Sequence, residues 1–214
     1  MLDRFITGEA CTTYILYNKD NDGIVVDPGY NVNNCLIKHI QKINVNVVGV
    51  LLTHGHYDHI AALEDIFNAY PKASLYISED EIGVIDNPKY NLSAFNKGWF
   101  NRQLIFVPEK TIKLMDYEKF VAAGYEIEMI KTPFHTRGSC CFYVKEENIL
   151  FSGDTLFSLS IGRSDLPTGS ERSIDSSLRK LINLQPETKV YPGHGPSTSI
   201  DRELKHNSYL KNLL

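Results

Sequence analysis

The chain has 214 residues, of which 43% are hydrophobic and 22% are charged, and this composition is ordinary for one folded α/β domain. Its formal net charge is -4 and its lysines and arginines form no basic stripe, so we expect no nucleic-acid partner. No apolar stretch approaches the ~20 residues that a membrane-spanning helix needs, and no signal peptide is visible, so we expect a cytoplasmic protein without a membrane partner.

The first half of the chain alternates strand-like and helical patterns. We expect a hairpin, a helix, a strand buried on both faces (because it is a continuous Val/Leu run) and a second helix. Their ranges are, in this order, Thr12–Tyr17 with Gly23–Asp27, Val32–Ile43, Val45–Leu52 and Ile60–Tyr70. The sequence Asp27-Pro28-Gly29 ends the second strand of the hairpin.

The second half continues this alternation. After a strand at Ser74–Ile77, we expect a short helix at Glu79–Ile85, whose first acidic residues suit the helix dipole, and a loop at Asn87–Gly98. The later elements are two or three strands within Lys113–Thr132, a hairpin of Ser139–Lys145 and Ile149–Ser152, a helix at Ser173–Leu184, a strand at Lys189–Tyr191 and a helix that begins near Ile200. Such alternation predicts an α/β layered fold, which places its site residues after the ends of strands.

The four cysteines show no C-x-x-C spacing, and two of them are adjacent in the chain; they are Cys11, Cys35, Cys140 and Cys141. This arrangement fits neither an ordinary disulfide framework nor a zinc ribbon. Because free cysteine is among the most buried residue types, we interpret all four as small core residues in a reducing compartment.

Three of the seven histidines lie in one short stretch directly after the buried strand. The stretch is Thr53-His54-Gly55-His56-Tyr57-Asp58-His59. Four side chains that can bind metal lie within six residues, and they cannot spread over one face of a helix. We therefore expect the loop to fold around a common centre. Imidazole and carboxylate are the usual ligands of zinc, manganese and iron. The alternative is a polar loop that contains histidines by chance, which should happen in well under ~1% of chains of this composition.

Three downstream residues complete an ordered set with this loop: His135 in Thr132-Pro133-Phe134-His135-Thr136, Asp154 in Ser152-Gly153-Asp154-Thr155 and His194 in Tyr191-Pro192-Gly193-His194-Gly195. Taken alone, a histidine such as His135 is more often structural than a ligand. As an ordered set, these residues resemble the metallo-β-lactamase-fold hydrolases. Within that superfamily the chain is similar to the glyoxalase II (hydroxyacylglutathione hydrolase) relatives of the short, single-domain bacterial type.

The resemblance covers essentially the whole chain and implies one domain over residues 1–214, without the C-terminal helical domain that holds glutathione in full-length relatives. It implies a four-layer αββα sandwich, in which two mixed sheets are flanked by helices. It also implies two divalent transition-metal ions, zinc in the first place and iron or manganese otherwise. The implied ligands are His54, His56 and His135 for one ion, Asp58, His59 and His194 for the other, and Asp154 between them.

The activity that the resemblance implies is hydrolysis of a small-molecule thioester, such as a hydroxyacyl-thiol similar to S-lactoylglutathione, by metal-bound hydroxide. Two metal ions can lower the pKa of a shared water from 15.7 to about 7. Asp58 could act as the catalytic residue that accepts the remaining proton. The thiolate leaving group, with a pKa near 8.5, needs no strong acid to depart. No Ser–His or Cys–His nucleophile pair is evident in the sequence.

The chain departs from the family pattern beyond Asp154. Glutathione-binding relatives carry a Lys and a Tyr where this chain has Arg163 and Asp165. These two residues could bind substrate, since an arginine can clamp a carboxylate bidentately, or they could form a structural pair. Phe134 and Arg137 stand where many relatives have Gly and Pro. Asp27 has two interpretations as well: support for the metal loop, or a simple turn.

The rival functions are a mononuclear-iron persulfide dioxygenase of the same fold, a lactonase, and a non-enzymatic protein with a structural metal. A structural zinc site has four protein ligands and no open position, whereas seven ligands shared by two ions leave room for water. The pattern therefore favours an enzyme. The two remaining histidines, His39 and His206, match nothing in the family pattern, and we expect both at the surface.

Overall fold

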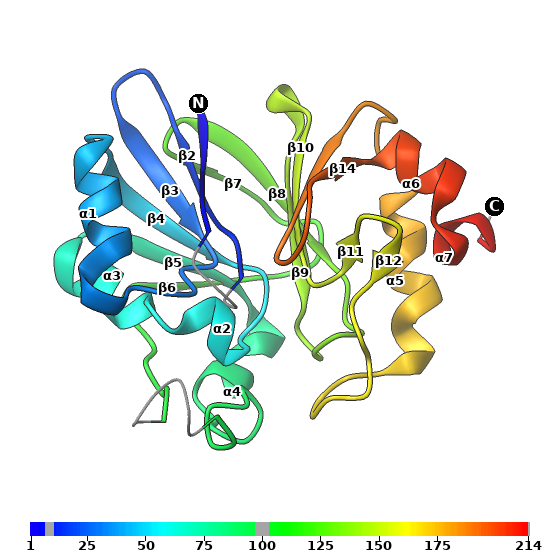
Figure 1. Ribbon diagram of the computed structural model, residues 1–214, viewed down its shortest axis with the longest axis horizontal. Coiled ribbons are helices and arrows are strands. Elements are labelled where there is room, and N and C mark those ends of the chain that lie inside the picture. Colours follow the sequence, from blue (N-terminus) through cyan, green and yellow to red (C-terminus); the bar gives the residue numbers. More distant parts are fainter. Residues whose placement is uncertain (7–10, 97–102, 214) are drawn as a thin grey trace.

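The computed structural model of the chain describes residues 1–6, 11–96 and 103–213. Two six-stranded sheets lie face to face, and helices cover their outer faces (Figure 1). The first sheet has the order β1-β2-β3-β4-β5-β6, in which the first three strands are antiparallel neighbours and β3 to β6 are parallel. Its strands are β1 (Leu2–Phe5), β2 (Thr13–Tyr17), β3 (Asp22–Val26), β4 (Asn46–Leu52), β5 (Ser74–Ser78) and β6 (Thr111–Leu114).

The second sheet has the order β14-β13-β10-β9-β8-β7 and is antiparallel except between β10 and β13. Its strands are β7 (Lys119–Ala122), β8 (Tyr125–Lys131), β9 (Cys140–Val144), β10 (Ile149–Gly153), β13 (Lys189–Pro192) and β14 (Thr198–Ser199). A small hairpin of β11 (Leu156–Phe157) and β12 (Ser160–Ile161) lies beside it.

Helices α1 (Cys35–Lys42) and α3 (Leu63–Ala69) cover the first sheet. Helices α5 (Ile174–Leu181), α6 (Ile200–His206) and α7 (Ser208–Lys211) cover the second, and the short α2 (Tyr57–Ile60) and α4 (Ile82–Ile85) lie at one end of the sandwich (Figure 1). The 3-10 turns are η1 (Val32–Asn34), η2 (Glu79–Glu81), η3 (Lys145–Glu147) and η4 (Glu171–Ser173). The four-layer αββα arrangement with two mixed sheets confirms the predicted fold class.

Three apolar layers hold these four structural layers together. Along β2, Tyr14 and Leu16 point between the sheets, whereas Ile15 points outward to α1 and α3. Along β10, Phe151 points between the sheets and Leu150 points to the helices on the far side. Strands covered on both faces bury successive residues, which explains their continuous apolar runs. Each fully buried side chain of this size contributes about 1.5–3 kcal/mol to folding.

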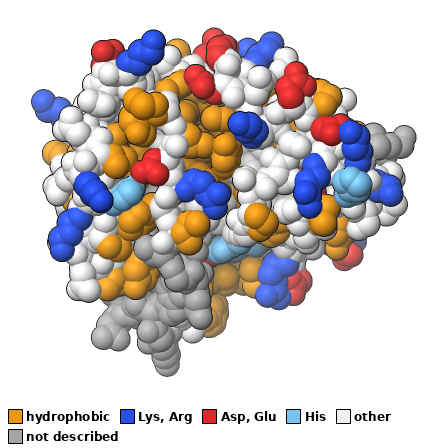
Figure 2. Space-filling view, turned by 45° about the horizontal axis from the view of Figure 1, so that its top comes forward, with side chains coloured by type: hydrophobic (Ala, Val, Ile, Leu, Met, Phe, Trp, Pro, Cys, Tyr) orange, Lys and Arg blue, Asp and Glu red, His pale blue; other side chains and the backbone are white. Residues whose placement is uncertain are grey.

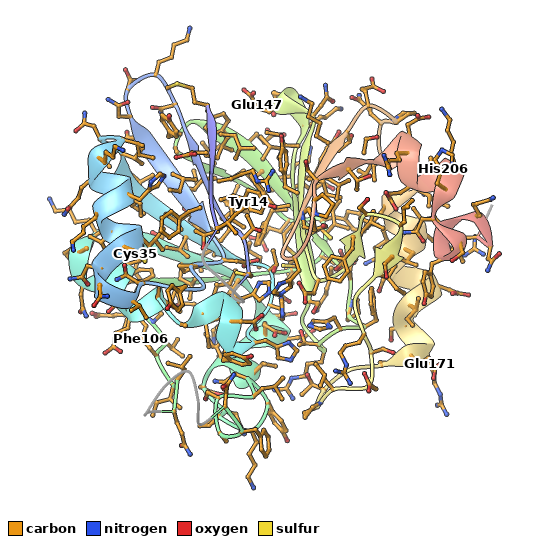
Figure 3. All side chains as sticks on the ribbon, viewed as in Figure 1. Tyr14, Cys35, Phe106, Glu147, Glu171 and His206 are labelled. Atoms are coloured by element: carbon orange, nitrogen blue, oxygen red, sulfur yellow. The ribbon has the colours of Figure 1, made fainter. Side chains whose placement is uncertain are left out.

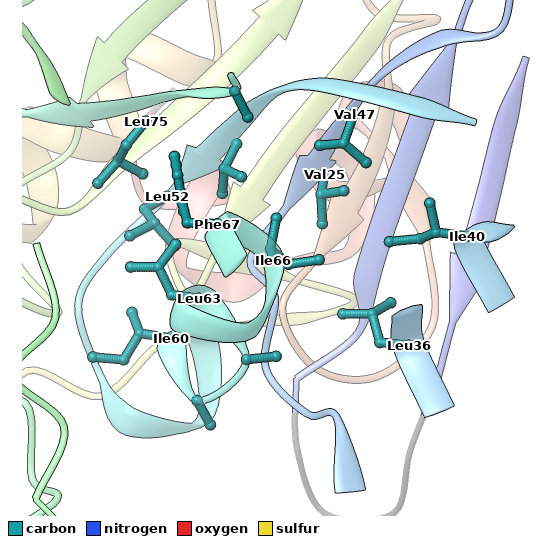
Figure 4. Packing of buried hydrophobic residues seen from close by; sticks show 14 of the residues in the cluster. Val25, Leu36, Ile40, Val47, Leu52, Ile60, Leu63, Ile66, Phe67 and Leu75 are labelled. Carbon is teal, nitrogen blue, oxygen red and sulfur yellow. The ribbon is translucent and has the colours of Figure 1, made fainter. Parts of the chain in front are cut away.

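The layer outside the first sheet shows how the helices contribute to this core. Ile66 of α3 and Leu36 of α1 are buried and pack against Val25 and Leu52 of the sheet (Figure 4). Tyr14 lies in the middle of the molecule, between the sheets, whereas Cys35 lies on the outer helix α1 (Figure 3). The helices therefore bury one face each, as amphipathic helices do.

The predicted hairpins at β2–β3 and β9–β10 are confirmed, and so is the buried strand β4 between two parallel neighbours. The region Lys113–Thr132 holds three strands, the first of which begins at Thr111. The predicted helix Ile60–Tyr70 begins only at Leu63, after a turn. Of the expected loop Asn87–Gly98, the last two residues lie outside the described ones.

Several sequence-based expectations about single residues need correction. Cys11, Cys140 and Cys141 are buried as expected, but Cys35 is partly exposed. His39 is half-buried rather than at the surface, because β1, which the sequence did not predict, brings Asp3 Oδ2 to 2.6 Å from His39 Nε2. His206 is exposed on α6, as expected (Figure 3).

The surface carries mixed charge. Lysines and arginines lie interspersed with aspartates and glutamates on the face in Figure 2, and apolar side chains gather between them. Within the described ranges, every helix is too short or too polar to cross a membrane.

Candidate metal centre

All seven candidate ligands meet at one end of the sandwich, because each follows the carboxyl end of a strand. The loop with His54, His56, Asp58 and His59 leaves β4 and enters α2. His135 follows β8, Asp154 follows β10, and His194 follows β13. The structure therefore brings together every candidate ligand that the sequence predicted, although His135, Asp154 and His194 lie far from the first loop in the chain.

The first group of candidate ligands consists of His54, His56 and His135, which are only 1–3% exposed. One nitrogen of each ring lies within 4.8 Å of the others, and His56 Nδ1 is 2.9 Å from His135 Nε2. Burial, together with the neighbouring histidines, lowers the pKa of His54 well below its ordinary value and that of His56 to about 3. Neutral rings with free lone pairs are the form in which histidine binds metal.

The second group consists of Asp58, His59 and His194. Asp58 Oδ2 lies 3.1 Å from His194 Nε2 and 3.8 Å from His59 Nε2. Burial opposes a charge on either ring, but Cys11, Asp27 and Asp58 raise the pKa of His59, and the hydrogen bond to Asp58 raises the pKa of His194. In this group, carboxylates surround the rings and hold protons that a cation would displace.

Asp154 lies between the two groups. Its Oδ1 is 3.4 Å from His59 Nε2, and its Oδ2 is 3.5 Å from His135 Nε2 and 3.8 Å from His194 Nε2. Burial raises the pKa of Asp154, but His59, His135 and His194 together lower it below its ordinary value, so the carboxyl stays ionised. Gly193 leaves room for this carboxylate, since a Cβ there would lie 2.5 Å from Asp154 Oδ1.

Buried polar atoms that make no hydrogen bond converge between the two groups of candidate ligands. Within the described part of the chain they include His54 Nε2, His56 Nε2, His59 Nε2 and Asp154 Oδ1. Each such atom costs about 1–3 kcal/mol when it is left unpaired, and a bound cation would remove that cost. Because the donors are imidazole nitrogens and carboxylate oxygens, the residues fit divalent zinc, iron or manganese.

Asp27 contacts the loop that carries His54, His56, Asp58 and His59. Its carboxylate accepts hydrogen bonds from Thr53 N at 2.8 Å and Thr53 Oγ1 at 2.7 Å, and its Oδ2 lies 2.9 Å from His59 Nδ1. Of the two interpretations left open by the sequence, the contacts favour the supporting one, because a carboxylate on the far nitrogen fixes the orientation of a histidine ligand. Asp27 also ends β3 in a left-handed conformation, with φ of 50°.

Arg163 and Asp165 lie at the solvent-exposed edge of the candidate metal centre, which we call its rim. Their exposed side chains pair with each other, as Arg163 Nε is 2.7 Å from Asp165 Oδ1. This hydrogen bond lowers the pKa of Asp165 to about 2. The backbone of Arg163 contacts a candidate ligand directly. Its carbonyl oxygen lies 2.7 Å from His135 Nδ1 and orients that ring, a contact that the residue type at position 163 does not predict.

Sequence reasoning missed one further residue. The sequence predicts only that Glu81 belongs to the acidic start of the helix Glu79–Ile85, but its side chain is 0% exposed and accepts a hydrogen bond from Gly55 N at 2.7 Å. Nothing in the run Glu79-Asp80-Glu81 distinguishes the third residue from its neighbours. A signal for it could come only from the long-range packing of η2 against the ligand loop.

Comparison with known families identifies this architecture. The family model for the metallo-beta-lactamase superfamily matches residues 6–194, and the chain belongs to that superfamily. A Streptococcus pyogenes protein named as a probable metallo-hydrolase is 35% identical over 206 residues, which span 95% of this chain and 86% of the relative. The hydroxyacylglutathione hydrolase GloC of Haemophilus influenzae is 29% identical over 92% of this chain and 91% of its own length.

Two solved structures are similar over nearly the whole chain. The crystal structure of the BLEG-1 B3 metallo-beta-lactamase matches with a TM-score of 0.88 and 30% identity, over 98% of this chain and 99% of that one. The crystal structure of TTHA1623 in a di-iron-bound form matches with a TM-score of 0.83 and 28% identity, over 97% and 100%. The superfamily predicted from the ordered ligand set is thus confirmed.

Proposed function

We propose that this protein is a dinuclear metal-dependent hydrolase that cleaves a thioester, such as a hydroxyacyl-thiol. The observation that carries the proposal is the pair of adjacent ligand groups with Asp154 between them, because one carboxylate faces both. The name of the Haemophilus relative, a hydroxyacylglutathione hydrolase, supports the choice of a thioester as substrate.

The proposed ligands of one ion are His54, His56 and His135, and those of the other are Asp58, His59 and His194, with Asp154 reaching both. Zinc suits this donor set, and iron or manganese are the alternatives. Bound divalent ions would polarise the substrate carbonyl and acidify a water molecule.

The side chains of the site can accept the proton of the attacking water, and the thiol can leave without an acid. Thioester cleavage consumes one water and releases a carboxylic acid and a thiol. Burial raises the pKa of Asp58, but the charge of His59 and the hydrogen bond from His194 lower it overall, so Asp58 enters the reaction ionised. Its Oδ2 can accept the proton of the attacking water, while His194 Nε2, 3.1 Å away, holds it in place. The thiol leaves as a thiolate with a pKa near 8.5, and therefore needs no strong acid.

The pair Arg163 and Asp165 at the rim suggests that the thiol part of the substrate is anionic. The Arg163 guanidinium is exposed and already binds a carboxylate, that of Asp165, through two nitrogens at 2.7 Å. A carboxylate of the substrate could take the place of Asp165 in the same fork geometry. We propose this exchange as the substrate-binding role of the pair.

The test is thiol release from S-lactoylglutathione by the purified protein, before and after treatment with a chelator. We expect turnover that chelation abolishes and that added zinc, iron or manganese restores. Asp58→Asn should reduce turnover strongly, whereas His206→Ala, a substitution of an exposed histidine outside the site, should not. Turnover that resists complete metal removal would overturn the proposal.

The second candidate is the mononuclear-iron persulfide dioxygenase of the same fold, and the similar TTHA1623 structure in a di-iron-bound form supports iron as an alternative metal for this donor set. Oxygen uptake on glutathione persulfide by the iron-loaded protein, without thiol release from the thioester, would establish that function instead. A lactone and a β-lactam complete the substrate panel, the latter because BLEG-1 is a metallo-beta-lactamase.

A further inference from the structure

A buried carboxylate connects the two loops that carry the tri-histidine group. Glu81, at the end of η2, is 0% exposed. Its Oε1 accepts from Gly55 N at 2.7 Å, and Gly55 stands between His54 and His56. Both of its oxygens lie 2.9 Å from Thr136 Oγ1, and Thr136 follows His135. Gly138 N donates to the same carboxylate, so three donors from two loops share one acceptor group.

Glycines allow the segment Glu79–Ile85 to approach both loops closely. A Cβ at Gly55 would lie 2.6 Å from Ile85 Cγ2 and 3.1 Å from Val84 Cγ1. A Cβ at Gly138 would lie 2.5 Å from both the backbone nitrogen and Oε2 of Glu81. Real Cβ atoms do not tolerate such contacts, so the glycines and Glu81 form one closely packed unit behind the ligands.

Burying the carboxyl group of Glu81 costs free energy, and packing alone does not require a carboxyl group at this position. Burial raises the pKa of Glu81 to about 7, against the hydrogen bonds from Gly55, Thr136 and Gly138. An apolar side chain of similar size could fill the space, but it would leave the buried N–H groups of Gly55 and Gly138 without an acceptor. Only a carboxylate offers enough lone pairs to hold donors from both loops at once.

We propose that Glu81 is a positioning residue, which sets the distance between His135 and the pair His54 and His56 and thereby the metal affinity of the tri-histidine group. The inference rests on the proposed function in so far as that group binds a metal ion. It extends that function to a residue outside the ligand set. Groups that orient metal ligands through hydrogen bonds change metal affinity by roughly 10–100-fold when they are replaced.

The chain offers a matched control in Glu203 of α6. Glu203 is also 0% exposed and also accepts from a backbone nitrogen, a hydroxyl and a third donor. These donors are Leu159 N at 2.8 Å, Thr198 Oγ1 at 2.5 Å and Asn207 Nδ2 at 2.9 Å. None of them lies in a ligand loop. A Glu→Gln substitution at either position therefore replaces a buried carboxyl group that makes the same kind of contacts.

The experiment is zinc binding by chelator competition, resolved into two equivalents, for the wild type, Glu81→Gln and Glu203→Gln. Glutamine has one acceptor oxygen, and its NH2 group would face the N–H of Gly55 or Gly138. We expect Glu81→Gln to weaken one equivalent by about 10–100-fold and to leave the other within about threefold. Glu203→Gln should lower the melting temperature but leave both equivalents within about threefold.

A milder pair of variants covers the case in which Glu81→Gln does not fold. Thr136→Val removes only the hydroxyl that contacts Glu81, whereas Thr136→Ser keeps it. We expect Thr136→Val to weaken the same equivalent severalfold and Thr136→Ser to retain wild-type affinity.

Equal zinc affinities in the wild type, Glu81→Gln and Thr136→Val would overturn the inference and leave the proposed function standing. Equal losses in Glu81→Gln and Glu203→Gln would also overturn it, because the effect would then be one of general stability. A wild type that binds no zinc, iron or manganese would refute the proposed function itself, and with it the inference.

Discussion

The two ligand groups of the site differ in charge and in access to solvent. His54, His56 and His135 are buried, burial lowers the pKa of His54 and His56, and Glu81 accepts hydrogen bonds from the loops that carry the three rings. The other group pairs its rings with carboxylates, and its His194 side chain is 36% exposed. The same residue type thus has a lowered pKa in one group and a raised pKa in the other, because burial dominates at His54 and carboxylates dominate at His194.

This contrast suggests a division of labour. A cation in the first group would meet three buried imidazole rings and Asp154, in a place that solvent hardly reaches. A cation in the second group would have its charge offset by Asp58 and Asp154 and would lie on the open side. We infer that the first group serves mainly to hold an ion and that substrate and water reach the second.

The largest effect should come from Asp154, because it is the carboxylate that both groups share. Asp154→Asn removes its charge while keeping its shape. We expect the variant to lose affinity for both metal equivalents, and thioester turnover to fall by at least about a thousandfold, as for groups that act as one catalytic unit. Metal content after gel filtration and kcat measure the two effects. Asp201→Asn, on the exposed face of α6, is the control. Full occupancy with normal turnover in Asp154→Asn would contradict the shared role.

An intermediate effect should appear in the acid stability of the metal-free protein. The folded pKa of His56 is about 3 against an ordinary 6.5, so below pH 6.5 the unfolded chain binds a proton that the folded chain rejects. This difference costs up to about 2 kcal/mol at pH 5 and vanishes above pH 7. His56→Gln removes the cost, so its stability should fall less than that of the wild type between pH 8 and pH 5.

The second group should show the opposite sign. The folded pKa of His194 is raised, so its contribution to stability is present below pH 6.5 and is lost as the pH rises through the folded value. His194→Gln should therefore lose more stability than the wild type on going from pH 8 to pH 5. Urea denaturation of the chelator-treated proteins at both pH values compares the slopes. If His56→Gln and His194→Gln deviate from the wild-type slope in the same direction, the electrostatic distinction between the groups is removed.

The smallest effect is expected at the rim. Arg163→Ala leaves the carbonyl oxygen that orients His135 in place and removes only an exposed guanidinium. We expect unchanged metal content and kcat but a several-fold higher KM for a thioester of an anionic thiol, as exposed charges contribute modestly. Asp165→Asn should lower that KM, because it frees the guanidinium. If both variants keep the wild-type KM, the pair has only a structural role.

Local sequence was sufficient for most of the framework. The continuous apolar run of β4, the hairpin turns and the spacing of His54, His56, Asp58 and His59 each express a rule that acts within a few residues. The family and fold followed from the order of these residues and of His135, Asp154 and His194. Element ends were less accurate, as at α3, because a turn near Ala61 interrupts a helical pattern that the sequence alone continues.

The tertiary structure decided everything that depends on contacts between distant segments. It turned Glu81 inward to meet Gly55 and Thr136, it placed the backbone of Arg163 on His135, and it covered His39 with β1. It also lowered the pKa of His54 and His56 in one group and raised the pKa of His59 and His194 in the other. These outcomes depend on burial and on neighbours tens of residues away in the chain. The local sequence pattern, which determined the strands and the ligand loop, contains no information about either.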